Sequence, residues 1–217
     1  MSQQIEQIIK CPKCGKELKF KVWKSISTET ESAIADIISG DLFRLKCDGC
    51  GYSTIVSYPM LFNDMVHNVW IWFVKGEEKS LDMNSIDVAK AIGTRVRIVD
   101  SQQSLREKTA IFNAGLDDRV VEIAKAATAL HLSKINGIYI QKMFLNVLGD
   151  GKYRWELVID GKRAYAECSK SLFKEIETVY AEDLSSEKDE PLVVDMNWAL
   201  DILEKEDDTV VPEESEV

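Results

Sequence analysis

Alternating apolar and polar positions predict strands in the first third of the chain. Leu18, Phe20 and Val22 are apolar, whereas Lys19 and Lys21 between them are charged. This period of two is typical of a half-buried strand. A similar alternation appears at 43–46 and 52–58, and the apolar run at 69–74 predicts a strand buried on both faces. We therefore expect a mainly β region at the N-terminus.

One helix is expected within this β region. Thr28 and Glu31 have the spacing of a capping box, in which two side chains satisfy free N–H groups at a helix start. Isoleucines follow at helical spacing at positions 34, 37 and 38, and Gly40 is a typical helix end. The pattern predicts a helix inserted between two strands.

A different pattern begins after residue 80. It predicts a strand at 95–99, a helix from the capping box Ser104–Glu107 to Gly115, and a second helix starting at Asp117. Three strands are expected at 138–148, 153–159 and 162–167, joined through glycine-containing turns, with a closing helix at 172–180. The predicted class is α+β, with an antiparallel sheet flanked by helices.

Polar and charged stretches suggest three parts. The polar segment 75–80 separates an N-terminal domain, 1–75, from an α+β domain, 80–180. The chain has a net charge of −10, but residues 181–217 alone carry −12, which leaves +2 for residues 1–180. This acidic tail contains an apolar island at 191–203 with Trp198. The island could dock on the body or on a partner, and we favour a free tail because of its charge density.

Paired cysteines provide the most specific chemistry. CPKCG at 11–15 and CDGCG at 47–51 are two knuckles. Each has two cysteines with two residues between them and then a glycine that suits a tight turn. Cys11, Cys14, Cys47 and Cys50 are the ligand set of a closed tetrahedral site, for which zinc is favoured over iron. Four protein ligands leave no open position, so we expect a structural site and not a catalytic one.

These knuckles, their spacing and the apolar stretch after them resemble the CpXC family, a mainly bacterial family with paired cysteine motifs. The resemblance covers about residues 8–74, and 95–125 is similar to the segment after that domain in longer members. It implies four metal-binding cysteines, here Cys11, Cys14, Cys47 and Cys50, and no particular activity. Asp48 stands where members commonly have proline, with the ligand spacing unchanged.

The compartment is inferred from features that the chain lacks. It shows no secretory signal pattern and no apolar run long enough to span a bilayer, which predicts a cytoplasmic protein without a membrane partner. Cysteine usage agrees, because four thiols have metal spacing. The fifth, Cys168, is expected to be a small buried residue.

No catalytic constellation is recognisable, and His67 and His131 are each expected to be packing residues. The leading hypothesis is therefore a non-enzymatic binding or scaffold module with an unknown protein partner. The alternative is a nucleic-acid-associated zinc-ribbon protein with an autoinhibitory acidic tail. Its binding face would combine Trp23 with cations at positions 19, 21, 44 and 46. An enzyme whose site is not legible from one sequence is the third option.

Overall fold

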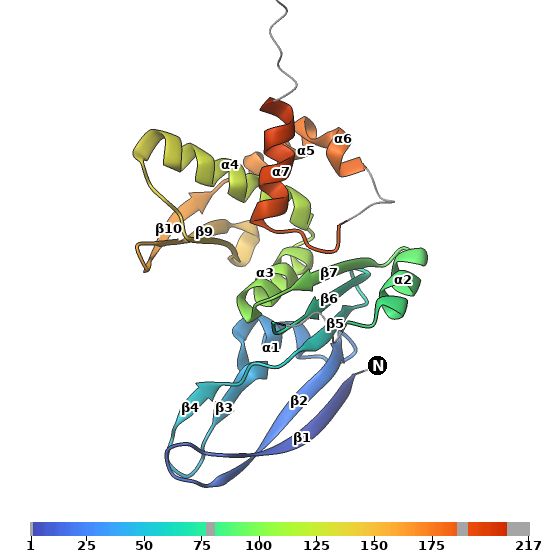
Figure 1. Ribbon diagram of the computed structural model, residues 1–217, viewed down its shortest axis with the longest axis vertical. Coiled ribbons are helices and arrows are strands. Elements are labelled where there is room, and N and C mark those ends of the chain that lie inside the picture. The colour runs from blue at the N-terminus through green and yellow to red at the C-terminus, as the bar shows by residue number, and fades with distance from the viewer. Residues whose placement is uncertain (1, 77–80, 186–190, 208–217) are drawn as a thin grey trace, which may run out of the picture. The chain divides into compact units, whose positions relative to one another are not determined.

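The computed structural model describes residues 2–76, 81–185 and 191–207 (Figure 1). It is a mixed α+β protein, as predicted, and it divides into two compact units, Met1–Asn113 and Ala114–Val217. Because the placement of the units relative to one another is not determined, each is described by itself.

The first unit is built on a five-stranded sheet. Its strands are β1 (Gln3–Lys10), β2 (Glu17–Ser27), β5 (Met60–Asp64), β6 (Val69–Phe73) and β7 (Arg95–Val99), in the spatial order β1-β2-β5-β6-β7. Neighbours are antiparallel in β1–β2 and β5–β6 and parallel in β2–β5 and β6–β7. A separate antiparallel ribbon contains β3 (Arg44–Lys46) and β4 (Ser53–Ile55).

Helices complete this unit: α1 (Ala33–Ser39), the short 3-10 helix η1 (Asp41–Phe43), α2 (Met83–Ala91) and α3 (Gln102–Asn113). The predicted inserted helix exists and ends at Gly40, whose φ of +79° suits glycine. It does not begin at the expected capping box, however. The Thr28 hydroxyl accepts a hydrogen bond from the Met65 N–H, and the helix N-cap is Ser32. The cap of α3 is likewise earlier than predicted, because the Ser101 hydroxyl accepts from the Ser104 N–H.

The expected domain boundary at 75–80 differs from the structure. β7 pairs along its whole length with β6, and α3 contributes buried residues to the same core as the N-terminal strands. The first unit therefore continues to Asn113, because β7 and α3, which follow the polar segment, pair with and pack against elements that precede it. Residues 77–80 themselves lie outside the described part of the chain.

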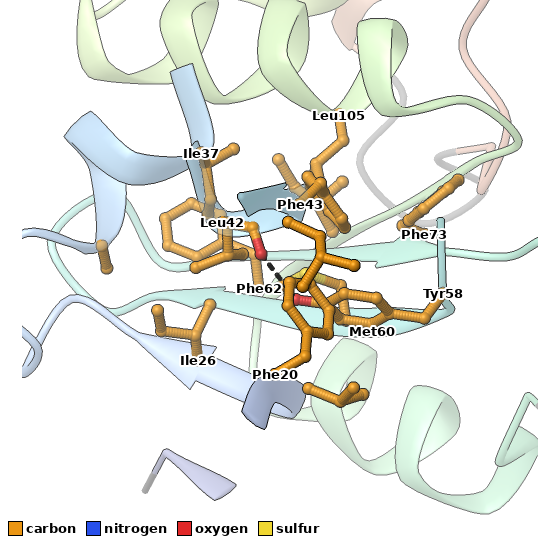
Figure 2. Packing of buried hydrophobic residues seen from close by; sticks show 14 of the residues in the cluster. Phe20, Ile26, Ile37, Leu42, Phe43, Tyr58, Met60, Phe62, Phe73 and Leu105 are labelled. Carbon is orange, nitrogen blue, oxygen red and sulfur yellow. Dashed lines mark hydrogen bonds between the residues drawn. The ribbon is translucent and has the colours of Figure 1, made fainter. Parts of the chain in front are cut away.

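Aromatic side chains form the centre of the first core (Figure 2). The Phe43 ring lies 5.0 Å from that of Tyr58 and 5.9 Å from that of Phe73, measured between centroids. The Tyr58 hydroxyl donates a hydrogen bond of 3.1 Å to the Leu42 carbonyl, which satisfies two buried polar groups. The predicted strand at 69–74 is less buried than expected, since Trp70 and Trp72 on its second face are only half-buried.

The second unit has the predicted three-stranded meander, β8 (Lys142–Val147), β9 (Tyr153–Ile159) and β10 (Lys162–Cys168), in the order β10-β9-β8. A 3-10 turn, η3 (Gly149–Gly151), joins the first two strands, and the helices are α4 (Asp118–Asn136), α5 (Lys170–Val179), α6 (Ala181–Ser185) and α7 (Met196–Asp207). Phe173 of α5 packs edge-on against Tyr153 and Trp155. Cys168 is buried, as predicted.

The expectation of a free tail is wrong for the described part of the apolar island. α7 packs on α4, and its residues Ala199 and Ile202 are buried, as is Val194 just before the helix, while Trp198 is half-buried. The burial of these apolar side chains outweighs the charge density that favoured a free tail. Residues 186–190 and 208–217 of the predicted tail lie outside the described ranges. Among the described residues, no helix is long and apolar enough to cross a bilayer.

Candidate metal centre

The four predicted cysteines converge on one point of the first unit. Their sulfur atoms all lie within 4.8 Å of one another, and among the described residues this is the cluster of ligand-type side chains that could hold a metal ion. The first knuckle is the turn between β1 and β2, and the second is the turn between β3 and β4. The centre therefore lies where the tips of two hairpins meet.

Both knuckles have the same backbone hydrogen bonds. In the first, the Gly15 N–H donates to the Cys11 carbonyl (2.9 Å) and the Cys11 N–H donates to the Lys16 carbonyl (2.8 Å). In the second, Gly51 donates to Cys47 (2.9 Å) and Cys47 donates to Tyr52 (2.7 Å). The two turns are thus geometrically equivalent, although two of the residues inside them differ.

Positive φ explains the glycine that comes after each pair. Gly15 has φ of +74° and Gly51 has φ of +70°, in the left-handed region that residues with a Cβ atom avoid. A Cβ atom built at either position would meet nothing within 4 Å. The requirement for glycine at these positions is therefore conformational and not steric.

The sulfur geometry fits a tetrahedral ion. Cys11 Sγ lies 3.7 Å from Cys50 Sγ, and Cys14 Sγ lies 3.6 Å from Cys47 Sγ. A tetrahedron with metal–sulfur bonds of about 2.3 Å has edges of about 3.8 Å, close to both distances. A disulfide needs about 2.05 Å, so all four cysteines are free thiols. The donor set is therefore compatible with a bound metal ion.

Burial is asymmetric in the same way in both knuckles. The first cysteine of each, Cys11 and Cys47, is buried and belongs to the apolar core, whereas Cys14 is exposed and Cys50 half-buried. One side of the centre is therefore covered by the core and the other faces solvent.

Charge within the cluster favours a cation. Burial raises the pKa of the Cys11 thiol, but hydrogen bonds from the backbone N–H groups of Cys14 and Lys13 lower it, and the net pKa is about 7. The Lys16 N–H lowers the pKa of Cys14, but the neighbouring thiols and burial raise it to about 12. Four thiolates at these distances repel one another unless a positive ion lies between them.

Asp48 links the two knuckles. Its carboxylate accepts a 2.8 Å hydrogen bond from Lys16 Nζ, which raises the pKa of Lys16 and holds the pKa of Asp48 below its usual range. The Lys16 stem passes 3.0 Å from the position that a Cβ on Gly49 would occupy. Asp48 thus makes an ion pair with the first knuckle across the centre. The sequence contained both residues, but their proximity depends on the fold.

A family model described as CpXC protein matches residues 9–125, which is more than half of the chain. The chain belongs to the CpXC family. The match confirms the resemblance carried by the two knuckles and by residues 95–125. No curated protein and no solved structure matches this CpXC protein.

The expected basic face is partly neutralised in this CpXC protein. Lys19 Nζ pairs with Glu6 at 2.9 Å, and Arg44 pairs with Asp41 at 2.9 Å. Trp23 is half-buried and packs against the core, whereas Lys21 and Lys46 are exposed. The face therefore carries less free positive charge than the sequence suggested.

The two histidines differ from each other. His131 is exposed on α4, so the prediction that it is a packing residue is wrong. His67 is partly buried and its Nδ1 lies 2.7 Å from Oδ2 of the buried Asp64, whose Oδ1 accepts from the N–H groups of Val66 and His67. The D-x-x-H spacing was a signal for this turn that the sequence prediction did not use.

Proposed function

We propose that this CpXC protein is a non-enzymatic zinc-binding module in which the ion has a structural role. The observation that carries the proposal is the convergence of four thiols from two hairpin tips, with sulfur spacings that suit a tetrahedral ion. Zinc is favoured over iron because it is the commonest ion in closed four-cysteine sites with this ligand spacing.

The proposed role of the ion is to hold the two hairpins together. The ribbon β3–β4 belongs to a different sheet from β1–β2, and the knuckles join their tips. Because Cys11 and Cys47 are part of the apolar core, release of the ion would leave buried thiols crowded together beside it. Metal binding and folding of this region are therefore expected to be coupled.

A binding or scaffold role is consistent with the closed site. Four protein ligands leave no position for substrate or water, so the ion supports a surface and does not activate a reactant. We propose that a surface of the first unit, supported by the ion, binds a protein partner in the cytoplasm. The partner is not specified by the site, because the proposed role of the four cysteines is to bind the ion.

Elemental analysis of the purified, reduced protein tests the metal. We expect one zinc per chain, lost in Cys11→Ser and in Cys47→Ser. Lys13→Ala is the matched control, since Lys13 is exposed inside the same knuckle and offers no sulfur. Chelation should unfold the first unit, as measured by loss of its amide protection. Bound iron, or full folding of the first unit without metal, would contradict the proposal.

Nucleic-acid binding is the second candidate, carried by the exposed Lys21 of β2 and the exposed Lys46 next to Cys47. Because phosphate contacts release counterions, such binding would weaken steeply with salt. Single-stranded RNA and DNA titrated at low and high salt separate the two candidates. Lys21→Glu should abolish a specific interaction with this face, and no binding at low salt would exclude it.

A further inference from the structure

Lys16 and Asp48 connect the two knuckles on one side of the metal centre. Lys16 Nζ lies 2.8 Å from Asp48 Oδ2, and the two side chains are 48% and 73% exposed. Lys16 directly follows the first knuckle, and Asp48 lies between the two cysteines of the second. The ion pair therefore joins two turns whose paired residues are 32 positions apart in the sequence.

The Lys16 stem approaches two of the four sulfur atoms. A Cβ atom built at Gly49 would lie 3.0 Å from Lys16 Cδ, 3.7 Å from Cys47 Sγ and 4.0 Å from Cys14 Sγ. The stem and these two sulfurs, which are 3.6 Å apart, thus lie around one small space that stays open because Gly49 has no side chain. The ion pair is therefore placed beside the Cys14–Cys47 edge of the centre.

We propose that the Lys16–Asp48 ion pair is a latch that slows release of the metal ion by holding the two knuckles together beside Cys14 and Cys47. The inference rests on the proposed metal-binding function. It adds to that function a device that controls how fast the ion leaves.

Burial indicates which parts of the knuckles move first during release. Cys11 and Cys47 are only 2% and 1% exposed and belong to the apolar core, so their movement requires rearrangement of close-packed side chains. Cys14 is exposed and Cys50 is half-buried, so separation of the ligands begins with these two residues. The latch holds Lys16, two residues after Cys14, to the second knuckle and therefore opposes this first step.

A latch and a purely electrostatic effect on the sulfurs have different consequences. Lys16 is positive and Asp48 is negative, so if each acted only through its charge, removing them would change the release rate in opposite directions. A latch is broken by removal of either partner, so both substitutions must speed release. An exposed ion pair changes an equilibrium by about two- to fivefold, and salt weakens it.

Transfer of zinc from the loaded full chain to an excess of a chromophoric chelator, followed by stopped-flow absorbance, tests the latch. We expect Lys16→Ala and Asp48→Ala each to release zinc about two- to fivefold faster, and the double variant to be no faster than either. Lys13→Ala, at an exposed position in the first knuckle, is the matched control and should release zinc at the original rate. High salt should speed release from the original protein and change the two variants little.

The outcomes separate the latch from the metal site itself. Absence of zinc from the purified original protein would contradict the proposed function and the latch with it. In zinc-loaded protein, rates that are unchanged in both variants, that change in opposite directions, or that add together in the double variant would overturn the latch alone. If a variant bound no zinc, the original protein would decide, because a release rate independent of salt would also overturn the latch.

Discussion

Alanine at Gly15 should weaken zinc binding by straining the first knuckle without creating a clash. The residue has φ of +74°, its N–H donates to the Cys11 carbonyl, and the space around an added Cβ is empty to 4 Å. The substitution keeps all four sulfur ligands. Any loss of affinity must therefore come from the backbone conformation.

The magnitude follows from the cost of a left-handed residue. A residue with a Cβ pays about 1–2 kcal/mol in this conformation. Because the knuckle must adopt it to bind the ion, this cost is taken from the binding free energy. At about 1.4 kcal/mol per factor of ten, affinity should fall about 5- to 30-fold. Gly51→Ala should behave in the same way, because φ there is +70° and the space is equally open.

Competition against a chromophoric chelator of known zinc affinity measures the effect. Gly15→Asn is the informative companion, since asparagine tolerates the left-handed region better than alanine and should lose less affinity. Lys13→Ala, at an exposed position in the same turn, should bind zinc like the original protein. Wild-type affinity for Gly15→Ala, or an Asn variant weaker than the Ala variant, would refute the conformational explanation.

Three other predictions concern the core, the tail and the unit boundary. Burial raises the pKa of Tyr58 to about 12, above the value of about 10 expected when unfolded. The stabilisation from the neutral Tyr58 is therefore complete below about pH 10 and is lost as the pH rises towards 12. In urea unfolding measured across this pH range, Tyr58→Phe should lose less stability at high pH than the original protein. Tyr165→Phe, at an exposed site, should lose as much as the original protein. Ile202→Ala should reduce the free energy of α7 packing by about 2 kcal/mol and make the amides at 196–203 exchange faster with solvent. Val193→Ala, at a position 47% exposed, should leave their hydrogen exchange slow. A fragment ending at Asn113 should unfold cooperatively, but one ending at Gly76 lacks the buried Val99, Leu105 and Phe112 and should not; cooperative unfolding of the shorter fragment would restore the boundary at 75–80.

Local signals predicted the four-cysteine cluster and much of the secondary structure. The spacing of Cys11, Cys14, Cys47 and Cys50 predicted that these residues lie close together, because two knuckles of equal geometry can bind one ion. The three-stranded meander could be predicted equally well, because glycine-containing turns separate its strands in the sequence. These features depend on residues that are near one another in the chain.

Strands β1 and β5 and helix α2 of the first unit were not predicted, and the side chains of β1 and α2 give no clear pattern. β1 exposes almost all of its residues, so an alternation between a buried and an exposed face is absent. α2 buries only Ile86 and Ala89, and its start at the Asp82 N-cap was not recognised. Edge position and shallow burial are properties of the assembled unit, and a pattern of apolar residues does not reveal them.

By itself, the sequence determined the paired cysteine motifs, the turns that carry them and the α+β class, because these depend on spacing and local conformation. Only the tertiary structure decided that β7 pairs with β6 across the polar segment and that α7 packs on α4. It also brought Asp48 to Lys16 across the two knuckles. The physical reason is that pairing and apolar burial depend on which surfaces meet in three dimensions, and those surfaces are distant in the chain.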